Sequence, residues 1–324
     1  MRRLVAVVAL SGLAVSGCRI GGILTRNVEQ TFQTERTLPS RITDARRPDA
    51  ALSVLWVGHA TVLIQIDDRF VLTDPVFTRF VGGLSRRLVE PGIAPEHLPK
   101  IDVAVISHMH FDHLSLGSLD MIEDRVGMLV VPDGGAAYVP GFSFPVRQLP
   151  TWSSVEIDGL RVTSVPVQHV GWRYGLDAEW MHAFSGYVVE YHGKSVYFGG
   201  DTALAPEKFR ATRSMFPSLD LAILPISPIE PRDFMKRTHV DPHEALASFA
   251  ALGAARMIPV HFETFINSID DPGEPRRLLA RLVEEQGLVD RVLPLAIGEQ
   301  RVVLARATAP GSGPAAAAGG TMPR

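Results

Sequence analysis

Directly after the apolar run Val103–Ser107, the chain reads His108-Met109-His110-Phe111-Asp112-His113. Neutral imidazole and carboxylate groups are the ligands that zinc and similar divalent ions bind. Side chains alternate along an extended segment, so His108 and His110 are expected on one side. Asp112 and His113 follow at the next turn, where they can face a second ion. The cluster is interior and interleaved with apolar residues, unlike a polyhistidine tag, and therefore predicts a metal centre.

Three further candidate ligands each follow a buried apolar strand expected later in the chain. They are His169 after Val162–Val167, Asp201 after Ser195–Gly199 and His261 after Met257–Val260. Sites in α/β proteins gather at the carboxyl ends of the strands, which is where these residues would lie. Singly, they also fit a loop histidine, a turn former and a core histidine. Together with the cluster, they complete a ligand set for two ions.

Short β-rich runs bounded by turn residues predict the strands of the domain. They are Leu52–Val57, Thr61–Ile66, Arg69–Thr73, Val103–Ser107, Met128–Val131, Leu160–Val165, Gly186–Tyr191, Ser195–Gly199, Leu219–Leu224 and Arg256–Val260. Asp241, Pro242 and Glu244 form a helix start, and a helical repeat around Leu278–Val283 ends at Gly287. Many strands with a few helices predict an α/β (α+β) fold in which helices cover two sheets.

Composition places the chain among ordinary soluble globular proteins. Of its 324 residues, 46% are hydrophobic and 21% are charged, which excludes a disordered or fibrous protein. The net charge of −3 and the pI near 6.4 come without a Lys/Arg block, so no nucleic-acid partner is expected. A single cysteine excludes both an internal disulfide framework and a thiolate-rich zinc site.

That cysteine, Cys18, ends an N-terminal segment typical of secretion. Two arginines precede the apolar run Leu4–Val15, which is shorter than the ~20 residues of a membrane span. Val15-Ser16-Gly17-Cys18 resembles a bacterial lipobox, whose cysteine carries lipid; the alternative is a plain signal peptide with an incidental cysteine. Residues 1–18 are therefore expected to be a lipoprotein signal. Lipid on Cys18 would anchor the chain in the cell envelope, and Arg19 favours the outer membrane.

The remaining chain divides into three expected parts. Residues 19–50 are polar and lack sustained periodicity, which predicts a tether or an extended lead-in. Residues 51–305 hold the strands and helices of a single domain. Residues 306–324 consist largely of Pro, Gly, Ser and Ala, which favours a disordered tail.

The order of the candidate ligands, HxHxDH followed by His, Asp and His, resembles the metallo-β-lactamase superfamily. Other segments resemble its branch of N-acyl-phosphatidylethanolamine-hydrolysing phospholipases D. These segments are Trp56–Leu63, Leu72–Phe77, Ile106–Leu114, Glu230–Lys236 and His239–Pro242. The similarity runs from about Ser53 to Glu299, so it covers nearly the whole expected domain.

The resemblance implies a four-layer αββα sandwich with hydrolase activity and two bound zinc ions, or two other divalent metals. The implied ligands are His108, His110 and His169 for one ion, Asp112, His113 and His261 for the other, and Asp201 as the bridge. A water between ions roughly 3.5–4 Å apart loses a proton near neutral pH and becomes a hydroxide nucleophile. This accounts for hydrolysis without a Ser or Cys nucleophile.

Asp112 and His239 are the residues predicted to take part in catalysis, with His239 contacting substrate or protonating the leaving group. Asp74 fits either an acceptor for the N–H of a ligand histidine or a turn former. His59 fits either a residue near the site or a packed turn histidine. Asp241 fits a helix N-cap better than a catalytic acid. Four other histidines are expected on the surface, namely His97, His182, His192 and His243.

Three functional classes fit this pattern. The first is a phosphodiesterase of phospholipase D type acting on N-acyl phosphatidylethanolamines, which the stretch Glu230–Pro242 favours. The second is a hydrolase of the same fold acting on a lactone, a cyclic phosphodiester or a β-lactam. The third is a non-catalytic envelope lipoprotein, which the complete ligand set disfavours.

The substrate of either hydrolase would be a small molecule or a lipid. The sequence is compatible with a homodimer. The segment Val170–Phe184 contains large side chains that fit either a wall for an acyl chain or ordinary packing, namely Trp172, Tyr174, Trp180 and Met181.

Overall fold

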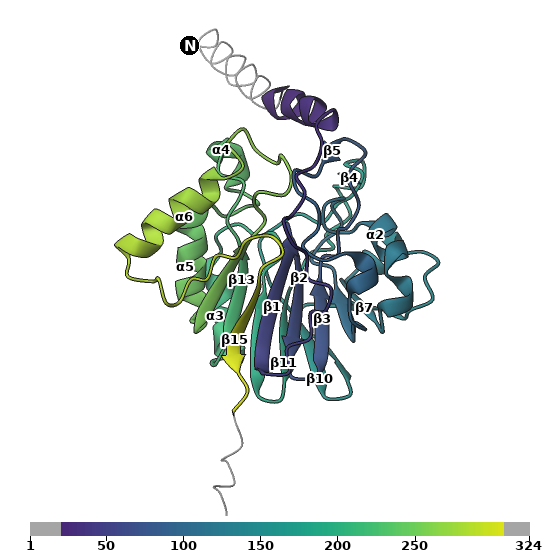
Figure 1. Cartoon of the computed structure of the whole chain (residues 1–324), viewed down its shortest axis with the longest axis vertical. Coiled ribbons are helices and arrows are strands. Elements are labelled where there is room, and N and C mark those ends of the chain that lie inside the picture. Colours follow the sequence, from purple (N-terminus) through teal and green to yellow (C-terminus); the bar gives the residue numbers. More distant parts are fainter. Residues whose placement is uncertain (1–20, 308–324) are drawn as a thin grey trace, which may run out of the picture.

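The computed structural model describes residues 21–307, in which two large sheets lie face to face with helices outside (Figure 1). A separate small sheet pairs β4 (Phe80–Val81) with β5 (Ser85–Arg86). The first sheet contains β1 (Ala50–Gly58), β2 (Thr61–Ile66), β3 (Arg69–Thr73), β6 (Val103–Val105), β7 (Leu129–Pro132), β8 (Val146–Leu149) and β15 (Gln300–Ala305). The second contains β9 (Ser154–Ile157), β10 (Leu160–Val165), β11 (Gly186–Tyr191), β12 (Lys194–Phe198), β13 (Leu221–Pro225) and β14 (Arg256–Val260). The strand orders are β15-β1-β2-β3-β6-β7-β8 and β14-β13-β12-β11-β10-β9.

Helices cover the outer faces of both sheets. They are α2 (Leu116–Met121), α3 (Pro206–Met215), α4 (Arg232–Met235), α5 (Pro242–Leu252) and α6 (Glu274–Glu285). Figure 1 shows α2 on the side of the first sheet, and α3, α5 and α6 on the side of the second. The predicted fold class, a four-layer αββα sandwich, is therefore confirmed.

The main core lies between the two sheets. Val62 of β2 and Val188 and Phe198 of the second sheet are fully buried in one cluster. Successive side chains of a strand point to opposite faces, so Leu63 reaches the outer side of the first sheet. There it shares a second buried cluster with Leu119 of α2. Both sheets are therefore fixed in place by apolar burial on two faces, which gives the strand ends a rigid support.

Helix α5 begins where the sequence predicts. The Asp241 carboxylate accepts the backbone N–H of Glu244 at 2.9 Å, as an N-cap does. The helix ends at Gly253, whose φ of 69° is the left-handed conformation of a C-cap. Asp241 is thus a capping residue, as expected.

The lead-in differs from the prediction of an extended tether, because residues 21–31 are helical and packed on the domain. Asn27 donates through Nδ2 to the Ile266 carbonyl at 3.0 Å, and Arg26 donates to the Ser268 and Asp270 carbonyls at 3.2 and 2.7 Å. The buried side of this helix is polar, so an amphipathic pattern of apolar residues was absent from the sequence. This helix is held instead by hydrogen bonds to the segment 266–270, more than 200 residues further along the chain.

Strands β8, β9 and β15 were not predicted. Each is an edge strand of its sheet and fully buries at most one of its side chains, so the apolar alternation is weak. The expected lipoprotein signal with Cys18, in residues 1–20, and residues 308–324 of the expected tail lie outside the described residues.

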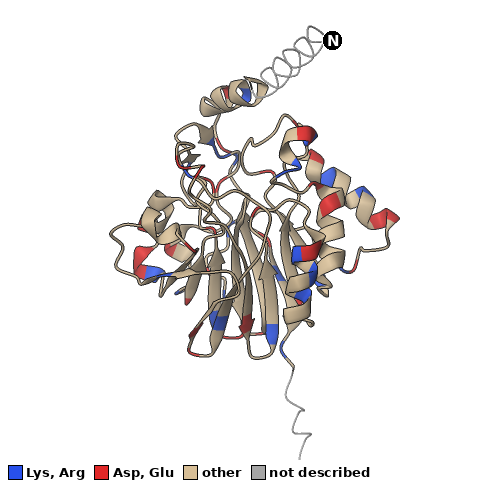
Figure 2. Cartoon of the chain, turned by 180° about the vertical axis from the view of Figure 1, so that it is seen from behind, with Lys and Arg blue, Asp and Glu red and all other residues tan. Residues whose placement is uncertain are grey.

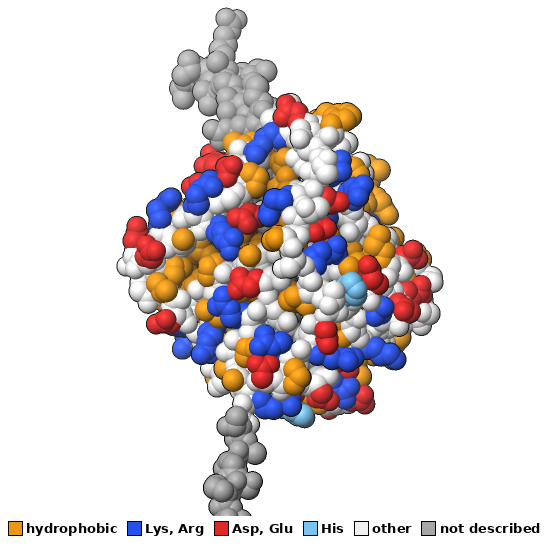
Figure 3. Space-filling model, viewed as in Figure 1, with side chains coloured by type: hydrophobic (Ala, Val, Ile, Leu, Met, Phe, Trp, Pro, Cys, Tyr) orange, Lys and Arg blue, Asp and Glu red, His pale blue; other side chains and the backbone are white. Residues whose placement is uncertain are grey.

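Acidic and basic side chains are interspersed over the helices and strand ends of the described part, as Figures 2 and 3 show. The sheet interiors in Figure 2 carry almost no charged side chain. Within residues 21–307, no helix combines the length and the apolar character that crossing a bilayer requires.

Candidate metal centre

The predicted ligands follow strands whose carboxyl ends meet at one edge of the sandwich. His108 follows β6, His169 follows β10, Asp201 follows β12 and His261 follows β14. Strands β12, β13 and β14 are parallel. Strand β10 runs in the same direction as β12, because the antiparallel β11 lies between them. Residues far apart in the sequence therefore converge.

The first group consists of His108, His110 and His169, whose ligand atoms lie within 4.8 Å of one another. Nδ1 of His169 lies 2.8 Å from the Thr238 carbonyl, to which it donates, so Nε2 is left free for a metal. Nε2 of His169 and Nε2 of His110 are both buried without a hydrogen-bond partner. Each nitrogen therefore lacks an acceptor or donor that the protein itself supplies.

The second group contains Asp112, His113 and His261, together with His59, again within 4.8 Å. Nδ1 of His261 lies 3.0 Å from the Ser227 carbonyl, so its Nε2 is also the free nitrogen. That atom lies 3.3 Å from Nε2 of His113. The two imidazoles thus direct the same ring position toward a shared point.

Asp201 lies between the two groups. Its Oδ2 is 3.3 Å from Nε2 of His113, and its Oδ1 is 3.1 Å from Nε2 of His261. Oδ1 nevertheless makes no hydrogen bond, because the approach to His261 lacks the required geometry. Several imidazole nitrogens and carboxylate oxygens thus lie close together around common points, as in a set of metal ligands.

Burial keeps most of these imidazoles neutral, which is the form that binds metals. It lowers the pKa of His59 to about 3 and that of His110 to about 4. It also holds the pKa values of His108 and His169 well below the ordinary range. The residues therefore fit divalent metal ions in two ways: buried ring nitrogens lack a hydrogen-bond partner, and the rings are neutral.

His113 is the exception. Burial lowers its pKa, but the carboxylates of Asp201, Asp112 and Asp74 outweigh that effect and raise it well above 6.5. Conversely, despite burial, neighbouring histidines hold the pKa values of Asp112 and Asp201 well below the ordinary range. Both carboxylates are thus ionised and available as ligands.

Asp74 lies behind His113, with Oδ2 at 2.6 Å from its Nδ1. The backbone N–H and the hydroxyl of Ser107 also donate to this carboxylate, each at 2.6 Å. His59 is buried next to the second group, where its Nε2 lies 3.1 Å from Oδ2 of Asp112 and its ring lies 4.0 Å from that of His261. Both residues therefore contact predicted ligands directly.

His239 reaches the centre from the segment before α5. Its Nε2 lies 3.1 Å from Oδ2 of Asp201, and its Nδ1 lies 2.9 Å from the Thr238 hydroxyl. Arg232 fixes this segment by donating to the His239 carbonyl at 2.6 Å. The four histidines expected on the surface are all exposed, as predicted.

Backbone strain concentrates around the centre. His59, Asp74 and His261 have φ angles of 53°, 35° and 70°, a left-handed region that L-residues rarely adopt. Each such residue costs roughly 1–3 kcal/mol, which the surrounding structure has to offset. The turns that follow β1, β3 and β14 are thus held in conformations that orient these side chains.

A cleft of about 550 Å³ opens directly on the centre, lined by both His110 and Asp112. Its other side chains are mostly apolar and include Val81, Phe111, Trp172, Tyr174, Phe265 and Ile266, with Asn267 and Arg173 as polar members. The ring of Trp172 lies 4.6 Å from that of His110. A substrate held at the centre would therefore also contact an apolar wall.

The aromatic loop 170–184 combines the two expectations made for it. Trp172 and Tyr174 line the cleft, whereas Met181 packs on the apolar core and Trp180 is 66% exposed. Sequence reasoning missed Arg173, Phe265 and Asn267 as cleft residues. Their positions a few residues after His169 and His261 were the available signal, since such residues stay close to the ligand they follow.

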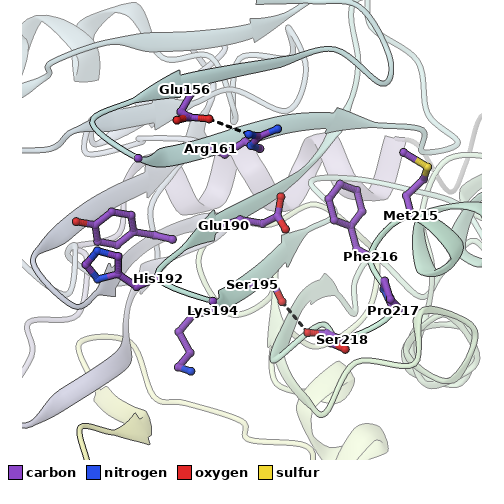
Figure 4. A pocket seen from close by; sticks show the side chains of 13 residues that line it. Glu156, Arg161, Glu190, His192, Lys194, Ser195, Met215, Phe216, Pro217 and Ser218 are labelled. Atoms are coloured by element: carbon purple, nitrogen blue, oxygen red, sulfur yellow. Dashed lines mark hydrogen bonds and ion pairs between the residues drawn. The ribbon is translucent and has the colours of Figure 1, made fainter.

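A second hollow, of about 600 Å³, lies on the outer side of β10, β11 and β12 and has no predicted ligand in its wall (Figure 4). It is lined by Glu190, Lys194 and the ion pair of Glu156 with Arg161, among others. The ion pair is half-exposed and satisfied within the chain, and none of the predicted metal ligands lines this hollow. The chemistry therefore belongs to the cleft at the centre.

Comparisons with known proteins agree with this geometry. The family model described as "Beta-lactamase superfamily domain" matches residues 69–262. The chain is 32% identical over 255 residues to N-acyl-phosphatidylethanolamine-hydrolyzing phospholipase D 1 of Caenorhabditis elegans, covering 73% of this chain and 71% of that protein. It is 30% identical over 252 residues to a metal-dependent hydrolase of Methanopyrus kandleri, covering 76% and 98%.

Among solved structures, an isothiocyanate hydrolase from Delia radicum gut bacteria superposes with a TM-score of 0.63 at 20% identity, covering 78% of this chain and 100% of that one. At that identity the likeness concerns the fold. The family match, the relatives and the clustered histidines and aspartates agree with one another. The chain belongs to the metallo-β-lactamase superfamily and is a metal-dependent hydrolase of that superfamily.

Proposed function

We propose that this hydrolase is a phosphodiesterase of phospholipase D type, which acts on N-acyl phosphatidylethanolamines or related phosphodiesters. The observation that carries the proposal is the apolar cleft that shares His110 and Asp112 with the metal centre. A substrate that joins a phosphodiester to an acyl chain matches both parts at once. The relative in Caenorhabditis elegans bears the name of this activity and matches most of the chain.

Two zinc ions are the proposed metals: His108, His110 and His169 would hold one, Asp112, His113 and His261 would hold the other, and Asp201, which lies between the two groups, would be shared. When bound, such ions lower the pKa of water and neutralise charge that develops on phosphoryl oxygens. The chain contributes orientation: Asp74 fixes the ring of His113, and Thr238 and Ser227 fix those of His169 and His261.

His239 supplies the proposed proton for the leaving group. It lies beside Asp201 at the edge of the centre and is partly accessible, so its ring can meet a substrate oxygen. Hydrolysis adds hydroxide from water to phosphorus, breaks the bond from phosphorus to the ethanolamine oxygen, and delivers a proton to that oxygen. The products are phosphatidic acid and an N-acyl ethanolamine.

The test is turnover in water labelled with oxygen-18, using the purified zinc-loaded chain and N-acyl phosphatidylethanolamine in mixed micelles. The label is expected in the phosphate and not in the ethanolamine hydroxyl. The Asp201→Ala variant provides the blank. Label in the alcohol, or no phosphodiester turnover alongside rapid opening of a lactone or a β-lactam, contradicts the proposal and favours the alternative hydrolase of the same fold.

We further propose that lipid on Cys18 anchors the enzyme in the bacterial cell envelope, with the outer membrane favoured by Arg19. The support is the lipobox-like sequence alone. Cys18→Ser is expected to release the chain from the membrane fraction or to leave it as an unprocessed precursor. Identical detergent partitioning of the two forms contradicts the anchor while leaving the hydrolase activity untouched.

A further inference from the structure

Arg173 occupies an unusual position between the aromatic loop and the metal-binding segment. Its side chain is buried, and Nη1 donates to the carbonyls of Met109 and Leu114 at 2.8 and 2.9 Å. The guanidinium carbon lies 4.2 Å from the centroid of the Phe111 ring. Arg173 therefore holds both ends of the segment that carries Asp112 and His113.

Among residues 21–307, the guanidinium of Arg173 forms no salt bridge with a carboxylate, and Asp177 acts on its charge only from a greater distance. The neighbouring Asp177 instead accepts the backbone N–H groups of Arg173 and Tyr174, each at 2.9 Å, and the hydroxyl of Tyr138. Nε of Arg173 is buried without a hydrogen-bond partner. Burying a cation without a directly paired counter-charge costs free energy, so an anionic partner from outside the chain would stabilise it further.

Arg173 is also the single Lys or Arg among the described side chains that line the cleft. Comparison with Arg87 is informative, because Arg87 is equally buried and also lacks a salt bridge. Arg87 lies outside the cleft wall, and its Nε and Nη1 donate to the carbonyls of Val89 and Val76. Arg87 thus contacts loop backbone and the Phe265 ring from outside the cleft wall, whereas Arg173 adds positive charge to the cleft itself.

We propose that Arg173 is a specificity-determining residue that binds an anionic oxygen of the substrate inside the cleft. The planar guanidinium is suited to oxyanions because it offers several N–H groups in a fixed geometry. The proposal rests on the proposed function only in identifying this oxyanion as the phosphate of a phosphodiester. A guanidinium recognises a carboxylate in the same way, so the experiment has to distinguish a carboxylate ligand from a phosphodiester.

The test is calorimetric titration of the full-length, zinc-loaded chain with dimethyl phosphate, which carries one negative charge and no acyl chain. Arg173→Gln is expected to weaken binding by about 10- to 100-fold, the size of a hydrogen bond to a charged group. The neutral trimethyl phosphate is expected to bind the variant and the parent alike. Arg161→Gln is the matched control, since it removes one positive charge at the distant hollow of Figure 4.

Because Arg173 also holds backbone carbonyls, zinc content and circular dichroism are measured for every variant. If Arg173→Gln loses zinc, Arg173→Lys decides the question: it keeps the charge but not the planar fork, and is expected to bind dimethyl phosphate several-fold more weakly. An unchanged ratio of dimethyl to trimethyl phosphate affinity in the variant that retains zinc overturns the proposal. In that case Arg173 only holds the metal-binding segment in place through the carbonyls of Met109 and Leu114.

Acetate supplies the second arm of the experiment. Loss of acetate binding in Arg173→Gln with unchanged dimethyl phosphate binding overturns the assignment to a phosphodiester. Binding is read without turnover, so the result is separate from the proposed activity. A chain that binds dimethyl phosphate through Arg173 but hydrolyses no phosphodiester supports this inference and contradicts the proposed function.

Discussion

Asp74 and His113 are both fully buried, with a carboxylate oxygen of Asp74 2.6 Å from Nδ1 of His113. The contact places Nδ1 of His113 as the donor to the Asp74 oxygen and leaves Nε2 as the ring nitrogen available to a metal. Nε2 lies 3.3 Å from Oδ2 of Asp201. Asp74 thus sets the direction in which a predicted ligand points, without itself facing the cleft.

Asp74→Asn is expected to weaken zinc binding by about 10- to 100-fold, as losing the partner behind a ligand histidine commonly does. The amide has the shape of the carboxylate but lacks its charge. Competition with a chelator measures the affinity. Asp124→Asn serves as control because its side chain is 79% exposed. Equal zinc affinity in both variants contradicts the role given to Asp74.

The purified full-length chain is expected to hold close to two zinc-like ions, as counted by elemental analysis. Asp201→Ala is expected to lose activity while its circular dichroism stays unchanged, since Asp201 contacts both ligand groups. His97→Ala, at an exposed histidine, is expected to change neither quantity. Less than one tightly held ion after gentle purification in zinc-supplemented buffer argues against a dinuclear centre.

His239→Ala is expected to slow phosphodiester hydrolysis by about 10²–10⁴-fold if His239 protonates the leaving group. The loss shrinks for a diester of 4-nitrophenol, because that leaving group departs without a proton. The ratio of kcat for the two substrates is the measurement, with His243→Ala, at an exposed histidine, as control. An equal loss on both substrates assigns His239 to positioning instead.

The metal-free chain is expected to lose stability as pH falls from about 6.5 toward 4. The pKa values of His59 and His110 are lowered to about 3 and about 4, whereas unfolded histidine titrates near 6.5. In that interval these histidines bind protons in the unfolded state but stay neutral in the folded state, so acid favours unfolding. His108 and His169 shift in the same direction.

His113 acts in the opposite sense, because its pKa is raised. Its contribution to stability is present below 6.5 and is lost as pH rises through the raised value. Below pH 6.5 His113 is protonated in both the folded and the unfolded state, so the slope in that interval is set by the four histidines whose pKa values are lowered. Urea midpoints at pH 7, 6 and 5 in chelator measure it. A midpoint that stays level or rises on acidification refutes the argument.

Particular elements show how far the sequence alone could predict the fold. Strands β2, β3, β10, β11 and β14 have the predicted bounds, because their runs of apolar residues are interrupted by turn residues. Helix α5 was found from its cap and its proline. The helix of residues 21–31 was missed, because polar contacts with a loop more than 200 residues away stabilise it.

The sequence by itself determined which residues are candidate metal ligands, since the HxHxDH motif and the residues after apolar strands indicate them through their types and spacing. It also determined the strand pattern from which the sandwich follows. Only the tertiary structure decided which residues share a wall with those ligands. Arg173, Phe265 and Asn267 belong to the cleft because their loops fold back over the strand ends. Contacts between loops depend on packing in space, so closeness in sequence to His169 and His261 points to these residues but does not fix the wall that they form.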